Sequence, residues 1–121
     1  MNNDTRVYDL EDRLRKFAAA VRSFVKRLPP DLSNQEDAKQ LVRSSGSIGA
    51  DYIEANDSLG KKDFLMKIKI CRREAKESMY WLQLIDSRKA KENSRAQASL
   101  IKEASELMRI FGAILRNSQR N

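Results

Sequence analysis

Apolar residues return at alternating steps of four and three along most of the chain, the spacing of one face of an α-helix. In the first segment this spacing joins Leu10, Leu14, Phe17, Val21, Phe24 and Leu28. Residues 38–55, 64–82 and 100–114 repeat it. No segment shows the strict alternation of polar and apolar positions that marks a β-strand. The pattern therefore predicts four amphipathic helices.

Residues that break or cap helices separate these segments. Pro29 and Pro30 end the first helix, because proline has no amide hydrogen and restricts the residue before it. Ser33 and Glu36 have the spacing of a capping box, which predicts the start of the second helix at Ser33. We expect Gly60 to end that helix in the left-handed conformation, which glycine adopts most easily.

Helices of similar length joined by short links favour an all-α fold, an antiparallel up-down-up-down four-helix bundle. The polar segment "DSRKAKEN", residues 86–93, forms the last link. With 121 residues, the chain has the size of one domain. We expect residues 1–121 to form a single four-helix-bundle domain.

Several classes of function are disfavoured by the composition. The chain has no histidine, the commonest general base and a common zinc ligand. The single Cys71 falls on the predicted core face, where a lone thiol packs as a small hydrophobe. Glutamates spaced three apart occur in di-iron bundles, but those sites also need histidine. We therefore expect no enzyme, metal or cofactor, and interpret the pairs Glu74/Glu77 and Glu103/Glu106 as solvated or salt-bridged.

No apolar run is long enough to cross a bilayer, and the first residues contain no apolar signal region. A cytoplasmic location is the expectation. The formal net charge is +7 and is distributed unevenly. Residues 31–60 carry net −4, whereas residues 61–86 carry net +3 and residues 87–121 net +5. One acidic segment thus lies among basic ones.

The third helix carries a basic side that ends in an aromatic residue. At about 100° per residue, four cations and one tyrosine fall within about 60° of one another, away from the core face. Such a side suits phosphate neutralisation, with the aromatic ring available to an unpaired base. The alternative is a solvated face that keeps the protein soluble. The predicted nucleic-acid-binding residues are Lys62, Lys69, Arg72, Arg73, Lys76 and Tyr80.

A second ridge of this helix mixes charged and apolar side chains, which is typical of a protein contact. Since the second helix is acidic and the third basic, another copy of the chain is a suitable partner. The alternative is that Trp81 folds into the core of its own chain. The predicted oligomer-interface residues are Glu54, Asp63, Lys67, Ile70, Glu74, Glu77 and Trp81.

The segments "SGSIGADYIEAN" and "KKDFLMKIKICRREAKESMYWLQLI" resemble a bacterial family of four-helix bundles encoded in intervening sequences of large-subunit ribosomal RNA genes, often labelled ribosomal-protein-like. The accessory variability determinants of diversity-generating retroelements look related to it. The resemblance covers nearly the whole chain. The residues that carry it are Ser47-Ile48, Glu54-Ala55, Lys62-Asp63-Phe64, Lys67, Glu74-Ala75, Glu77, Tyr80-Trp81-Leu82, Glu103-Ala104 and Glu106-Leu107.

This resemblance implies an up-down-up-down bundle that assembles into a ring-shaped homopentamer with a positively charged surface. It also implies nucleic-acid binding for the retroelement relatives, whose ring holds a reverse transcriptase. The chain departs from the family pattern at Asp51, usually asparagine, and at Arg72 and Arg73, which make this copy more basic.

Two functions are consistent with these observations. The first is a non-enzymatic, homo-oligomeric protein that binds RNA or DNA with little sequence preference. The second is an interaction scaffold whose basic face docks a reverse transcriptase or another acidic protein without touching nucleic acid.

Overall fold

The computed structural model describes residues 2–87 and 90–119 and contains four α-helices within those ranges, with no strand. They are α1 (Asn2–Lys26), α2 (Leu32–Asn56), α3 (Lys61–Leu84) and α4 (Lys91–Gln119). The all-α four-helix-bundle prediction is confirmed. None of these helices is apolar over a length sufficient to cross a bilayer.

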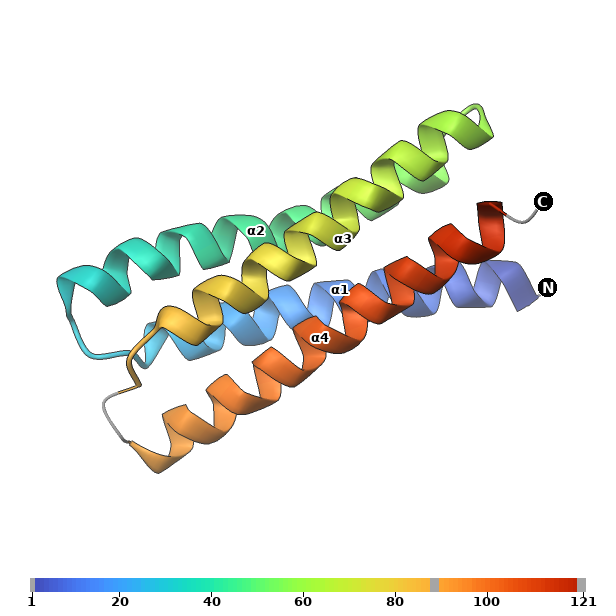
Figure 1. The fold of residues 1–121 in the computed structure, drawn as a ribbon. Coiled ribbons are helices and arrows are strands. Elements are labelled where there is room, and N and C mark those ends of the chain that lie inside the picture. The colour runs from blue at the N-terminus through green and yellow to red at the C-terminus, as the bar shows by residue number, and fades with distance from the viewer. Residues whose placement is uncertain (1, 88–89, 120–121) are drawn as a thin grey trace.

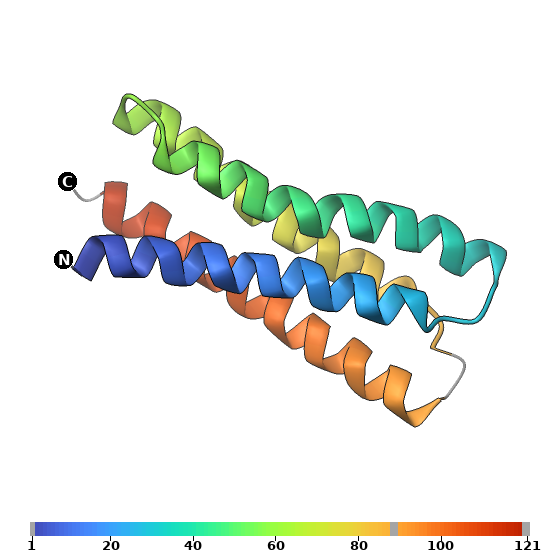
Figure 2. The same ribbon diagram turned by 180° about the vertical axis from the view of Figure 1, so that it is seen from behind.

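Successive helices run in opposite directions, so the bundle has the up-down-up-down order (Figure 1). The α1–α2 and α3–α4 connections lie at one end, and the α2–α3 turn lies at the other, with the start of α1 and the end of α4 (Figures 1 and 2). The closest packing joins α2 to α3 and α3 to α4, whereas α1 packs less closely against α4. Helix α3 is therefore held on two sides by its neighbours.

The apolar stripe predicted for each helix forms the core. Leu14, Val21, Leu41 and Ile48 are buried among the side chains of the other helices. Among the residues whose burial is described, the cluster of buried core residues is Leu14, Phe17, Val21, Phe24, Leu41, Ile48, Tyr52, Ala55, Ile68, Cys71, Ala75, Leu82, Ile85, Leu100, Ala104, Leu107, Phe111 and Leu115. Leu10, Leu28, Phe64, Met79 and Ile114 of the predicted stripes are only half-buried and pack at the margin.

The structure corrects both predicted ends of α2. Its N-cap is Asp31, whose Oδ1 accepts a hydrogen bond from the Asn34 amide at 3.2 Å, so the capping box predicted at Ser33 is wrong. The helix already ends at Asn56, before Gly60. Gly60 has φ −149° and is the N-cap of α3, an extended conformation open to any residue, so the left-handed turn expected there is also wrong.

Amide side chains fix the connections at the end of the bundle opposite the α2–α3 turn. Asn34 Nδ2 donates to the Asp86 carbonyl at 2.7 Å, and the Asp86 amide donates back to Asn34 Oδ1 at 3.0 Å. Gln97 Nε2 donates to the carbonyls of Leu82 and Ile85, where α3 ends. These bonds satisfy main-chain groups that a helix end leaves without partners. They attach the end of α3 to α2 and α4.

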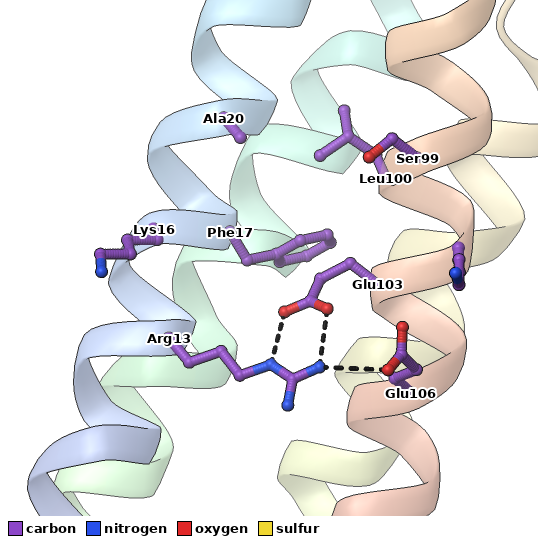
Figure 3. A pocket seen from close by; sticks show the side chains of 9 residues that line it. Arg13, Lys16, Phe17, Ala20, Ser99, Leu100, Glu103 and Glu106 are labelled. Carbon is purple, nitrogen blue, oxygen red and sulfur yellow. Dashed lines mark hydrogen bonds and ion pairs between the residues drawn. The ribbon is translucent and has the colours of Figure 1, made fainter.

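One ion-pair cluster joins α1 to α4 across their open seam. Arg13 Nε and Nη2 donate to the two carboxylate oxygens of Glu103 at 2.7 and 2.8 Å, and Nη2 lies 3.6 Å from Glu106 Oε1 (Figure 3). The cluster lines a groove of about 440 Å³ whose wall includes Phe17 and Leu100. The interpretation of Glu103 and Glu106 as salt-bridged is confirmed.

We predict that Arg13→Met lowers the free energy of unfolding by about 1–2 kcal/mol, because it removes a two-pronged, half-buried charge contact between helices. Lys16→Met is the matched control. It breaks the exposed Lys16–Asp12 pair within α1 and should change stability by less than about 0.5 kcal/mol. Urea unfolding followed by circular dichroism measures both changes. Equal effects of the two variants would show that the Arg13 cluster adds nothing.

Candidate functional site

The five cations predicted to bind nucleic acid all lie exposed on α3. Core packing of Ile68, Ala75 and Leu82 holds the opposite side of this helix against the bundle. Among the described residues, no carboxylate forms an ion pair with any of the five cations. We call them the basic ribbon: Lys62, Lys69, Arg72, Arg73 and Lys76.

Four members of the basic ribbon enclose a surface groove. Lys69, Arg72, Arg73 and Lys76 line a hollow of about 240 Å³, and no other residue in the described ranges contributes to its wall. Their spacing covers two turns of α3, or about 10 Å along its axis. Lys62 lies outside this groove. Like charges held together without a neutralising carboxylate produce a positive potential that favours a bound anion.

Tyr80 extends the basic ribbon by one helical turn and is 54% exposed. Its ring contacts that of Trp81 edge to face, with centroids 5.0 Å apart and planes at 71°. Trp81 is half-buried and packs against the core. Part of the indole therefore packs into the core of its own chain, as the alternative interpretation expected, and the rest is accessible to solvent.

The predicted oligomer ridge is less uniform than its sequence pattern. Lys67 Nζ lies 2.8 Å from Asp63 Oδ1, so this pair is already satisfied within α3. The hydrogen bond between them raises the pKa of Lys67 and lowers that of Asp63. Glu54 and Glu77 are exposed, whereas Ile70 is half-buried. The predicted ridge on α3 lies beside the basic ribbon.

Large apolar side chains on the outside of the α2–α3 hairpin were missed in the sequence. Met66 is 55% and Leu84 is 48% exposed on α3, and Ile53 of α2 and Leu59 of the turn are also exposed. Met66, Ile70 and Leu84 fall within about 40° of one another at 100° per residue. This spacing could have predicted an exposed apolar line from the sequence, but charged residues lie between its members. The outer side of α3 therefore carries an apolar line next to the basic ribbon.

Glu74 is not solvated or salt-bridged, so that interpretation is wrong. The carboxyl group is half-buried, and its Oε1 atom is buried without a hydrogen-bond donor from a described residue. Burial and, to a smaller extent, the nearby Asp51 and Glu77 carboxylates raise the pKa of Glu74 to about 8, against the opposing charge of Arg73. Protonation of Glu74 removes the repulsion between its carboxyl group on α3 and the Asp51 carboxylate on α2. Burial also raises the pKa of Cys71 to about 12, which keeps its thiol protonated.

No group of three or more Asp, Glu or Cys side chains in the described ranges is arranged to hold a metal ion. The arrangement on α3 instead offers fixed positive charges, an exposed aromatic ring and an apolar line. Such groups bind and position a partner.

We predict that wild-type stability falls as the pH rises from about 5 to 8. A raised carboxyl pKa means that the folded state holds more protons than the unfolded chain in this window, so deprotonation favours unfolding. Glu74→Gln should flatten the decline and be more stable than the wild type at pH 9 by about 2 kcal/mol. Glu92→Gln, an exposed control on α4, should retain the decline. Parallel pH profiles for wild type and Glu74→Gln in urea unfolding would contradict the prediction.

The chain is similar to a known protein family in sequence and to a solved protein in structure. Residues 6–113 match the sequence profile of the 23S rRNA-intervening sequence proteins. A crystal structure of a protein of unknown function from the S23 ribosomal protein family of Bacteroides thetaiotaomicron superposes with a TM-score of 0.74 and 27% identity, over 91% of this chain and 97% of that one. No curated protein matches the sequence. Because the profile match spans most of its length, the chain belongs to the family of 23S rRNA-intervening sequence proteins.

Proposed function

We propose that this protein is a non-enzymatic, homo-oligomeric nucleic-acid-binding protein with little sequence preference, and that the basic ribbon of α3 holds the phosphate backbone. One observation carries the proposal: four cations line a groove to which no carboxylate of the described part of the chain contributes. The name of the family, which refers to ribosomal RNA, supports RNA as a partner.

The chemistry of the groove favours phosphates over bases. Arginine and lysine bind phosphate oxygens through charge and hydrogen bonds that are the same at every nucleotide. The described lining of the groove contains no asparagine, glutamine or acidic side chain, the residues that read adenine and cytosine edges. Binding is thus expected to follow the charge of the polymer more than its sequence, and to weaken as salt rises.

Self-association would multiply this attraction. The apolar line of Met66, Ile70 and Leu84 lies next to the ribbon, so a second copy could cover it and leave the cations accessible. The family resemblance implies a homopentamer, and we propose that stoichiometry here. Several grooves in one assembly would bind the same strand. After the first groove has bound, each further contact is intramolecular, which raises the overall affinity.

A scaffold function is the second candidate, since the same unpaired cations also suit carboxylate clusters on a protein. In that case the ring would dock a reverse transcriptase or another acidic protein without touching nucleic acid. The experiment below separates the two candidates because it uses purified protein and nucleic acid alone.

We predict that labelled RNA binds at low salt, with log K falling against log salt by about 0.7–0.9 per neutralised phosphate. The triple variant Lys69→Glu, Arg73→Glu and Lys76→Glu should lose binding at least tenfold. A matched variant changes Lys26, Lys91 and Arg95, which are exposed on α1 and α4, to glutamate. It has the same net charge as the α3 variant. It should bind more tightly than the α3 variant. Fluorescence anisotropy at several salt concentrations measures all three proteins.

Two results would contradict the proposal. Absence of binding at low salt would remove nucleic acid as a partner and favour the scaffold candidate. Equal losses in both triple variants would show that net charge, and no particular surface, controls binding. Light scattering coupled to size exclusion tests the assembly, and a monomer at micromolar concentration would contradict self-association.

A further inference from the structure

Tyr80 is an aromatic side chain that lies outside the core of the bundle. More than half of its surface is exposed, although it follows directly on a ribbon of cations. Trp81 supports it from the side and is itself packed against the core. Because the two planes meet at 71°, the Trp81 ring does not lie parallel on Tyr80. Tyr80 is therefore a supported ring with surface available to a flat ligand.

The position of Tyr80 relative to the groove limits what that ligand can be. Tyr80 lies four residues beyond Lys76, a rise of about 6 Å along the axis of α3. Stacked bases are spaced about 3.4 Å apart along one strand of a duplex. A base that lies on the Tyr80 ring beside a phosphate in the groove needs a free face, which neighbouring bases cover in a duplex. The spacing suits a strand whose bases are splayed apart.

We infer that the α3 surface selects single-stranded nucleic acid, with phosphates in the groove of Lys69, Arg72, Arg73 and Lys76 and a neighbouring base stacked on Tyr80. This inference rests on the proposed nucleic-acid binding and adds the class of strand that is bound. In a duplex each base is paired and stacked within the helix, so its face cannot reach an aromatic ring that lies beside the phosphates. A duplex can use the cations alone.

Trp81 provides the readout for this contact. It is the only tryptophan of the chain and touches Tyr80, so a base that stacks on Tyr80 alters the environment of the indole. Titration with oligouridine or oligothymidine of about 12 nucleotides, within the usual range of single-strand sites, is compared with a duplex of equal length. Tryptophan emission and the anisotropy of labelled probes are followed at low salt.

We expect both single strands to bind about tenfold more tightly than the duplex and to change Trp81 emission. Tyr80→Ala should weaken single-strand binding about 5- to 100-fold, the range seen when one stacking aromatic is removed. Duplex affinity should change less than about twofold, because the phosphate contacts remain. Tyr80→Phe keeps the ring and should retain wild-type affinity. Leu32→Ala, an exposed apolar control on α2, should leave single-strand binding unchanged.

Equal affinity for duplex and single strands would overturn the inference. Equal losses for both ligands with Tyr80→Ala would do the same. If Tyr80→Ala has no effect while the α3 charge reversal abolishes binding, stacking is wrong and the proposed function survives. If no nucleic acid binds the wild-type protein, the proposed function fails and the strand preference fails with it.

Discussion

Burial of one apolar stripe of α3 between α2 and α4 determines which side chains of α3 face the solvent. Ile68, Cys71, Ala75 and Leu82 are inaccessible to solvent, so α3 cannot rotate about its axis without exposing them. The Ser44 and Ser78 hydroxyls, 2.8 Å apart in the α2–α3 interface, favour the same register. The side of α3 opposite this stripe therefore points outward. Every proposal about partners depends on that orientation.

The α2–α3 interface also contains a half-buried carboxyl group, Glu74, whose pKa is raised. The Asp51 carboxylate of α2 lies close enough to Glu74 to raise its pKa, and Glu74 Oε1 is buried without a hydrogen-bond donor from a described residue. An amide at position 51 would carry no charge and could donate a hydrogen bond to this neighbour. The interface that orients the cations is thus sensitive to proton concentration, and the predicted oligomer ridge contains Glu74 itself.

Local sequence patterns predicted the helices and the core, because a period of 3.6 residues is set by the geometry of each helix alone. Leu14, Ile48 and Leu107 could be assigned to the interior without knowing their neighbours. Contacts between distant residues were not readable. Arg13 and Glu103 are 90 positions apart in the sequence, and Asn34 and Asp86 are 52 apart. Residue spacing along the chain does not indicate either contact.

The site was predicted in part for the same reason. Angular position on a helix is local, so the exposure of Lys69, Arg73 and Lys76 followed from the position of the core stripe. The burial of Glu74 depends on how closely α2 approaches, which helical periodicity does not encode. Capping choices also failed: Asp31 and Ser33 both suit an N-cap, and the path of the chain after Pro30 decides between them.

The central claim is that nucleic acid lies along the outer side of α3. Ultraviolet crosslinking of oligouridine to the wild-type protein, followed by tryptic digestion and mass spectrometry, locates the contact directly. Cleavage after Lys76 releases residues 77–88, which contain Tyr80 and Trp81. The account predicts that crosslinked nucleotide is found on this peptide. Crosslinks confined to peptides of α1 or α4 would contradict it.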